Sequence, residues 1–367
     1  MGFARTHGMH LFTDISAHGL GHLAISAPVL NALATLVPGL RITVRSRLPA
    51  SKLRERIAAP FELIEAASDF GFIMHDALAV DREASAHAYR AAHAEWSQRV
   101  AEETEFLRTL APDAVLSNVA YLPLAGAKQA GIPALAICPL NWADLFEHFF
   151  AGEPWSAAIH AQILAAYRDA DVFLRPMPGM PMPKLDKGEA IAPIAACGTR
   201  HELGLGEGRN ILIALGGFAH RLPVERWPRF PGTRWLVPAD WQCRHPDAIA
   251  FEHLGLSFTD LLTSVDAVIT KPGYGTFAEA ACNGTPVLYL RRDNWPEQDY
   301  LIDWLQTHGR CRELPAERLH AGEFDEELTS LLNTPTPPLP LPQGAIQAAR
   351  RILDWLDPAL RNASRTL

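Results

Sequence analysis

Residues 266–290 read DAVITKPGYGTFAEAACNGTPVLYL, in which two short apolar runs enclose a glycine-rich turn and a helix-like segment. The runs 266–270 and 286–290 are rich in β-branched and aliphatic residues, as in strands that are buried on both faces. A strand, a helix and a second strand in this order are typical of parallel strands joined by helical crossovers. The stretch therefore predicts a parallel α/β sheet, with the glycine-rich turn at the carboxyl end of a strand.

The same alternation runs through most of the chain. Further strands are predicted at 9–15, 40–46, 113–118, 133–140, 210–215 and 234–238, and helices at 22–36, 84–110, 123–130, 259–264 and 343–356. A proline-rich break at 176–193 and a glycine-rich one at 204–208 divide the pattern in two. We predict an α/β protein with two doubly wound Rossmann-like domains facing a central cleft, at 1–200 and 201–342. Residues 343–367 would form a C-terminal helix and tail that pack back across the domains.

Length and composition narrow the classes of protein. The chain has 367 residues, 48% of them hydrophobic and 20% charged, and a net charge of −8. That length is enough for about two hydrophobic cores. No run of lysine or arginine is present, so a nucleic-acid partner is not expected. The five cysteines lack metal-ligand spacing, and neither a signal peptide nor an unbroken membrane-spanning stretch is found. We expect a cytoplasmic protein.

The turn in the opening stretch has two interpretations. Thr276 and Glu279 have the spacing of a capping box at a helix start, and the glycines then serve only the turn. That interpretation does not explain Lys271 or the second glycine. A helix N-terminus beside a lysine, with Gly273 and Gly275 allowing close backbone approach, is also a phosphate site. Spacing alone does not decide between the two.

Three other loops follow predicted strands, where parallel sheets bind ligands. LGGF (215–218) could turn backbone N–H groups toward a diphosphate. DISAHGLGHLAIS (14–26) sets His18 and His22 among glycines, and histidine suits general-base chemistry near neutral pH. RRDNWPEQ (291–298) would ordinarily be a solvated face, although its last two residues could reach sugar hydroxyls.

Two of these motifs carry a family resemblance. DAVITKPGYGTFAEAACNGTPVLYLRRDNWPEQ (266–298) resembles the donor-binding segment of GT-B glycosyltransferases of the MurG-like kind, the glycosyltransferase family 28 type. It is more similar still to the glycosyltransferase-like N-terminal region of plant L-arabinokinases. AHGLGHLAISAPVL (17–30) resembles the Gly-His loop that opens the first domain of the same proteins.

The resemblance implies a metal-independent, inverting glycosyltransferase, a hexosyl or pentosyl transferase without a cofactor, that uses a nucleotide-sugar donor, UDP-linked by expectation. The donor-binding residues that it implies are Gly216, Gly217, Phe258, Lys271, Gly273, Tyr274, Gly275, Thr276, Glu279, Glu297 and Gln298. His22, or else His18, would be the base. The candidates on the side of the unknown acceptor are Asp14, His75, Asn118 and Trp142. Asn118 stands where many relatives have an aspartate, which leaves a His–Asp dyad open.

Two other kinds of protein fit the same motifs. A hydrolysing nucleotide-sugar epimerase and a non-catalytic nucleotide-sugar-binding protein could each use the donor segment. No sugar-kinase domain follows, so arabinose phosphorylation is not expected. Asp169 and Asp171 match an Asp-x-Asp metal motif, but they lie where a helix is predicted to pass into a strand, and no metal site is assigned to them.

Overall fold

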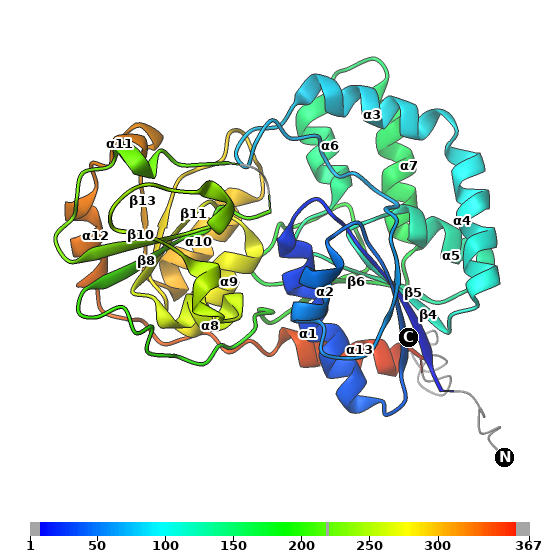
Figure 1. Ribbon diagram of the computed structural model, residues 1–367. Coiled ribbons are helices and arrows are strands. Elements are labelled where there is room, and N and C mark those ends of the chain that lie inside the picture. Colours follow the sequence, from blue (N-terminus) through cyan, green and yellow to red (C-terminus); the bar gives the residue numbers. More distant parts are fainter. Residues whose placement is uncertain (1–7, 218–219, 357–367) are drawn as a thin grey trace. The chain divides into compact units, whose positions relative to one another are not determined.

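The computed structural model describes residues 8–217 and 220–356. The chain divides into two compact units, each built on one parallel sheet (Figure 1). Unit 1 is formed by Met1–Ile73, Asp81–Ile194 and Gln343–Leu367, and unit 2 by Met74–Val80 and Ala195–Pro342. The two predicted Rossmann-like domains are therefore confirmed as two parallel α/β sheets. Phe218 of the LGGF turn and the predicted tail at 357–367 lie outside the described residues.

Unit 1 has a seven-stranded sheet in the order β3-β2-β1-β4-β5-β6-β7. Its strands are β1 (His10–Ile15), β2 (Arg41–Arg45), β3 (Glu62–Ile64), β4 (Ala114–Asn118), β5 (Ala134–Ile137), β6 (Val172–Pro176) and β7 (Gly188–Ile191). All neighbouring pairs are parallel. The central strands β1 and β4 are buried along their whole length, as apolar runs between two helical layers must be. Their register pairs Ile15 with Asn118, so both strands end side by side.

Helices cover both faces of this sheet. They are α1 (Leu20–Leu36), α2 (Ala50–Arg56), α3 (Arg82–Ala94), α4 (Trp96–Leu110), α5 (Leu122–Ala130), α6 (Trp142–Phe150), α7 (Ser156–Asp169) and α13 (Gly344–Leu356). Figure 1 shows α1 and α13 along one side of the sheet and α4, α5 and α7 along the other. Among the described helices of the chain, none combines the length and apolar character needed to cross a membrane.

One predicted helix, 84–110, is wrong as a single element. The structure has α3 and α4 instead, joined at Glu95, whose backbone dihedrals (φ −111°, ψ 33°) are not helical. His93 and Trp96 stack across the joint with ring centroids 4.9 Å apart, and Arg99 Nη1 donates to the Ala92 carbonyl. Side-chain packing therefore breaks the helix at a place where neither glycine nor proline signals it.

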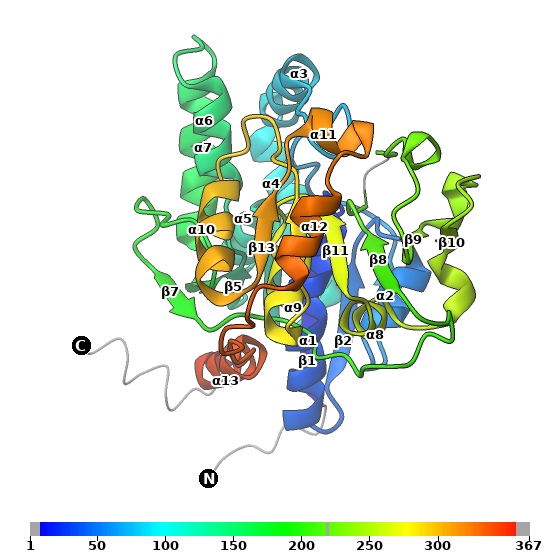
Figure 2. The same cartoon turned by 90° about the vertical axis from the view of Figure 1, so that its left-hand side faces the viewer.

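Unit 2 has a six-stranded sheet in the order β10-β9-β8-β11-β12-β13. Its strands are β8 (Arg209–Ile213), β9 (Thr233–Val237), β10 (Ala248–Ala250), β11 (Ala267–Thr270), β12 (Val287–Tyr289) and β13 (Cys311–Glu313), all parallel to their neighbours. Its helices are α8 (Phe258–Ser264), α9 (Tyr274–Asn283), α10 (Gln298–His308), α11 (Ala316–Ala321) and α12 (Asp325–Leu332). In Figure 2, α8, α9 and α10 lie side by side, and each packs against the next.

A short segment from the first half of the chain, Met74–Val80, groups with unit 2. Leu78 packs against the buried core of this unit, and its carbonyl accepts a hydrogen bond from Asp293 N at 3.0 Å. Asp76 Oδ2 lies 3.2 Å from His220 Nδ1. His75, an acceptor-side candidate that the sequence placed in the first domain, therefore belongs to unit 2 because its neighbours anchor there.

A buried ion pair ties the centre of unit 1 together. The Arg45 guanidinium contacts Asp14 Oδ2 through Nε at 2.5 Å and both carboxylate oxygens of Glu103 at 2.6 and 2.8 Å. Ser68 Oγ donates to the other Asp14 oxygen at 3.1 Å. All three charged side chains are buried, so each depends on the others for compensation.

Replacing Arg45 by methionine should leave two carboxylates buried without a counter-charge. We expect Arg45→Met to lower the free energy of unfolding by about 3–5 kcal/mol, measured by urea titration at pH 7. The double variant Arg45→Met with Glu103→Gln is the control and should recover part of the loss. A single variant as stable as the wild type would contradict this account of the network.

Candidate functional site

The start of α9 differs from the capping box that the sequence predicted. The helix begins at Tyr274 with Gly273 as its N-cap, and no side chain caps it. Thr276 is therefore the third helical residue and Glu279 lies in the second turn, so the predicted N-cap is wrong. Glycine at this position supplies no oxygen to the first backbone N–H groups. These donors carry the positive end of the helix dipole, which favours an anion.

Lys271 lies against both glycine-rich turns of unit 2. A Cβ atom at Gly216 would be 3.7 Å from Lys271 Nζ, and one at Gly273 would be 3.8 Å away. Gly216 has φ +87°, a conformation that glycine adopts without strain. The turns after β8 and β11, which are adjacent strands, thus converge on one ammonium group.

Burial and, to a smaller extent, the positive charge of Arg292 lower the pKa of Lys271 to about 7, while Glu297 opposes the shift. The ammonium is therefore partly deprotonated at neutral pH. A bound anion would favour its charged form.

The loop after β12 brings a residue that the sequence did not single out, Arg292. Its guanidinium lies 3.7 Å from the centre of the Trp295 ring and is buried. Glu297 Oε2 accepts a hydrogen bond from Trp295 Nε1 at 3.1 Å. Gln298 bonds to the backbone of Arg292 through both ends of its amide, at 2.9 and 3.0 Å. Glu297 and Gln298, predicted to contact sugar hydroxyls, thus both have partners within their own loop.

The other predicted donor residues lie on α9, on the neighbouring helix α8 or in the turn after β8. Tyr274 and Gly275 are buried in the first turn of α9. Glu279 is 1% exposed, and burial of this kind limits how far its carboxylate can reach a ribose. Phe258 opens α8, whose N-cap Ser257 accepts from Asp260 N. Gly217 is exposed in the turn after β8.

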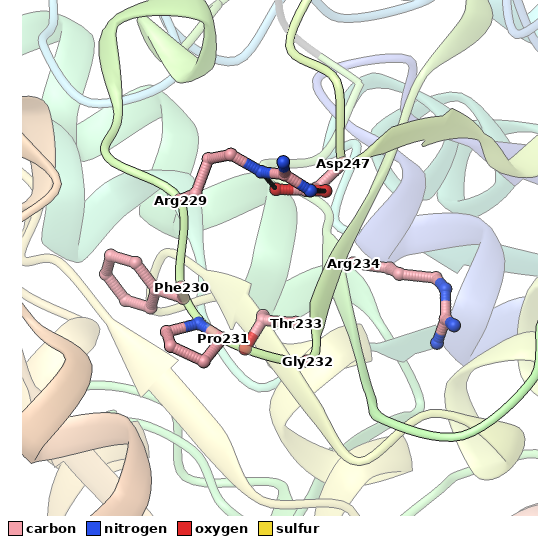
Figure 3. A pocket seen from close by; sticks show the side chains of 7 residues that line it. All are labelled: Arg229, Phe230, Pro231, Gly232, Thr233, Arg234 and Asp247. Atoms are coloured by element: carbon pink, nitrogen blue, oxygen red, sulfur yellow. Dashed lines mark hydrogen bonds and ion pairs between the residues drawn. The ribbon is translucent and has the colours of Figure 1, made fainter.

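A cavity of about 400 Å³ lies elsewhere in unit 2, at the amino end of β9 (Figure 3). In it, Arg229 Nε and Nη2 contact the two oxygens of Asp247 at 2.8 and 2.6 Å. Because parallel sheets bind ligands at the carboxyl ends of their strands, this cavity is not assigned to the site.

In unit 1, the first turn of α1 sets His22 against the end of β4. Asn118 Nδ2 donates to the His22 carbonyl at 3.0 Å and to Ser26 Oγ at 2.9 Å. The amide oxygen therefore faces His22 Nδ1, 2.8 Å away, and accepts a hydrogen bond from its N–H group. This assigns the neutral Nδ1–H tautomer and leaves the lone pair on Nε2. Burial lowers the pKa of His22 to about 4, and the Asn118 hydrogen bond offsets only part of this.

His18, Trp142 and the loop 68–73 surround this histidine. The Trp142 ring lies 5.1 Å from that of His18 and 5.9 Å from that of His22, measured between centroids. Gly71 (φ +61°) packs so tightly that a Cβ there would come within 2.7 Å of His18 and 2.9 Å of Trp142. Of the predicted acceptor-side residues, Trp142 therefore lies beside both histidines, and Asn118 contacts His22.

Asp69 is a second residue that the sequence did not identify. Its Oδ2 accepts a hydrogen bond from Trp142 Nε1 at 2.8 Å. Burial and the charge of Asp14 raise its pKa to about 7. The Ser-Asp-Phe-Gly sequence after β3 resembles a loop at a strand end, which is the only local signal. Asp14, predicted on the acceptor side, is instead 1% exposed and paired with Arg45, so its role is structural.

The chain is similar to a plant protein in sequence and to several solved structures in fold. No protein-family model matches the chain. L-arabinokinase of Arabidopsis thaliana is 25% identical over 330 residues, which are 84% of this chain and 31% of that protein. The chain thus spans about a third of the length of this relative.

Solved structures align over almost the whole chain. The glycosyltransferase of kitacinnamycin (16% identity) and CalG4, the calicheamicin glycosyltransferase (17% identity), each match with a TM-score of 0.61 over 98% of both chains. This protein has the GT-B fold. A UDP-N-acetylglucosamine 2-epimerase matches with a TM-score of 0.55 and 14% identity, over 95% of this chain and 96% of its own. The spinosyn rhamnosyltransferase SpnG complexed with thymidine diphosphate matches with a TM-score of 0.52 and 15% identity, over 95% of this chain and 96% of its own.

The GT-B likeness extends to the architecture and leaves the roles of individual residues as predictions. Within residues 8–217 and 220–356, no group of three or more His, Cys, Asp or Glu side chains is arranged to hold a metal ion. The expectation of a metal-independent GT-B reaction stays a prediction as well.

Asp69 should make the stability of this GT-B protein depend on pH. Because its pKa is raised, the stabilisation of the folded state by the Asp69 carboxyl is fully present below about pH 4 and is lost as pH rises toward 7. An asparagine in place of Asp69 can still accept the hydrogen bond from Trp142 Nε1. We therefore expect Asp69→Asn to gain about 1–3 kcal/mol over the wild type at pH 8, and little at pH 4. Urea titrations at both pH values measure this, and a gain independent of pH would contradict it.

Proposed function

We propose that this protein is a glycosyltransferase that moves a sugar from a nucleoside-diphosphate donor to an acceptor hydroxyl. The observation that carries the proposal is the convergence of two glycine turns and Lys271 on the open N-terminus of α9. Such a place offers several backbone N–H donors and one titratable cation to a small anion. The GT-B fold supports the same reading, and a GT-B glycosyltransferase has been solved with thymidine diphosphate bound.

The chemistry required of unit 2 is stabilisation of the leaving nucleoside diphosphate. Negative charge grows on the bridging oxygen as the bond to the anomeric carbon breaks. Fixed dipoles and an ammonium in a partly buried site stabilise that charge more than water does. In this proposal the diphosphate raises the pKa of Lys271, so that binding at pH 7 or above takes up a proton. No divalent metal is required for these steps.

Unit 1 would supply the base. His22 is neutral, and Asn118 fixes the tautomer that leaves Nε2 free to accept a proton from an acceptor hydroxyl. An aspartate in place of Asn118 would also stabilise the imidazolium, which a neutral amide does less well. The low pKa of His22 therefore makes it a weak base that works over a wide range of pH above about 4. Direct attack by the acceptor on the anomeric carbon would invert its configuration.

A hydrolysing epimerase is the second candidate, because a UDP-N-acetylglucosamine 2-epimerase shares the fold. It would release free nucleotide from the donor in the absence of any acceptor. A protein that only binds nucleotide sugars would show affinity without turnover. The kinase activity in the name of the plant relative is not proposed, because this chain covers only 31% of it.

Binding of nucleoside diphosphates should depend on Lys271. We expect one of UDP, dTDP, GDP or CDP to raise the melting temperature, and Lys271→Met to weaken that nucleotide about tenfold or more, since a charge-assisted contact is lost. Lys128→Met, at an exposed site on α5, is the matched control. Calorimetry in two buffers of different ionisation enthalpy should detect proton uptake at pH 8 in the wild type alone.

Absence of a melting shift with every nucleotide would reject the donor site. A shift that Lys271→Met leaves unchanged would place the anion away from the α9 turn.

Turnover, in contrast, should depend on His22. With a donor and acceptor found by screening, we expect His22→Gln to lower kcat by about 10²–10⁴-fold, as for loss of a general base. Nucleotide affinity should stay within twofold of the wild type, because the change lies in unit 1. His18→Gln tests the alternative base, and a larger loss in that variant would reverse the assignment.

A further inference from the structure

Arg292 presents a buried guanidinium edge to which nothing in the described chain is bonded. The side chain is 6% exposed as a residue. Its Nε and Nη2 atoms have no hydrogen-bond partner among residues 8–217 and 220–356. Leaving charged donors buried and unpaired costs free energy, so such an edge is typical of a site whose partner is a ligand.

These two atoms, Nε and Nη2, are the pair through which arginine forms two hydrogen bonds to one oxyanion. Nε–H and the nearer Nη2–H point the same way in the plane of the guanidinium and meet two oxygens at once. The chain itself uses this geometry twice. Arg229 binds Asp247 through Nε and Nη2 at 2.8 and 2.6 Å, and Arg351 binds Glu189 through the same atoms at 2.8 and 2.7 Å. Arg292 has the same pair available without a carboxylate to fill it.

The surrounding loop holds Arg292 in place without hydrogen-bonding to this edge. Trp295 stacks on the flat face of the guanidinium, so the N–H groups project sideways from the stack. Both polar atoms of the Gln298 amide bond to the Arg292 backbone. The next residue, Asp293, donates its backbone N–H to Leu78. These contacts restrict the loop from three sides, and none of them uses the open edge.

Arg292 also acts on the same electrostatic environment as the α9 site. Its charge lowers the pKa of Lys271, and Glu297 interacts with both cations. Burial raises the pKa of Glu297, which weakens its use as a counter-ion for the pair. The pair Lys271 and Arg292 is therefore short of negative charge, and a diphosphate with two ionised phosphate groups would supply it.

We propose that the Nε–Nη2 edge of Arg292 binds two oxygens of the second, sugar-bearing phosphate of a nucleoside diphosphate, while Lys271 and the start of α9 hold the diphosphate beside it. This assignment rests on the proposed function and adds a second cation to the donor site. A carboxylate on the transferred sugar has the same chemistry as the phosphate and is the source from which the experiment must distinguish it.

The test compares Arg292 with its neighbour. Arg292→Lys keeps the charge and loses the two-pronged edge, and Arg292→Gln serves if that variant does not fold. Arg291→Lys is the matched control, since Arg291 is exposed and paired with Asp299 and Glu313. Calorimetry measures the affinities for UDP and UMP, and for dTDP and dTMP. Circular dichroism and thermal melting establish that each variant is folded.

We expect Arg292→Lys to weaken both diphosphates about tenfold or more and to change both monophosphates by less than about threefold, because only the diphosphates carry the second phosphate. Arg291→Lys should leave all four affinities within about twofold, since an exposed pair contributes little.

Three results would overturn the assignment. An unchanged diphosphate affinity means that the edge binds something else. Equal losses for UDP and UMP place it at the first phosphate. If the wild type prefers UDP-glucuronate to UDP-glucose, and Arg292→Lys loses only that preference, the edge binds a sugar carboxylate. Failure of the wild type to bind UDP and dTDP, and GDP and CDP as well, rejects the proposed function itself, and this pattern differs from the other three.

Discussion

The site depends on one constraint, which is that a polar group on a buried parallel strand needs a partner, as Asp14 of β1 has in Arg45 of β2, so that polar groups meant for a ligand belong at the strand ends. In β11 all four residues are buried and only the last is polar, and β4 ends on Asn118. Polar side chains are therefore pushed to the strand ends, where the sheet delivers them to a common edge. Helix N-termini open at the same edge. The chemistry of this protein follows from what the chain places in those few turns.

At the edge of unit 2, the decisive choice is glycine at the N-cap of α9. A threonine there would satisfy a backbone N–H by itself, and the helix would need no ligand. Gly273 leaves that donor to water or to an anion and lets the chain pass within van der Waals distance of Lys271. The helix gives up a small amount of intrinsic stability at this end. Glycine at this N-cap also leaves room and positive potential for a phosphate group.

Much of the architecture could be predicted because it depends on local pattern. The alternation of apolar runs with helical segments identified both sheets, and glycines after strands identified the turns at 19–21, 216–217 and 273–275. What could not be predicted depends on side-chain packing, between residues both near and far apart along the chain. The break at Glu95 follows from rings stacking across it. Segment 74–80 belongs to unit 2 through Leu78, which no local signal indicates.

The functional residues that were missed share the same cause. Arg292 reads as a surface charge in RRDNWPEQ, and only the stacking of Trp295 and the folding back of Gln298 remove it from solvent. Asp69 reads as a loop acid until Trp142 binds it. Thr276 and Glu279 have the spacing of a capping box, yet the N-cap is Gly273, three residues earlier. The spacing of residues in a motif does not show which of them are buried, because burial depends on the segments that pack against them.

Burial gives the titratable groups of both units a common property, because it shifts each toward its neutral form. Burial is the leading cause in all three: it lowers the pKa of His22 to about 4 and that of Lys271 to about 7, and raises the pKa of Asp69 to about 7. A neutral amide at Asn118 continues this pattern, since it orients His22 without adding charge. Arg292 is the exception, because its pKa, lowered to about 10, keeps it ionised. The α9 turn of unit 2 tolerates being empty because burial favours the neutral form of Lys271. It becomes strongly polar when an anion arrives and restores the charge of Lys271, so the ligand completes the electrostatics that burial left unbalanced.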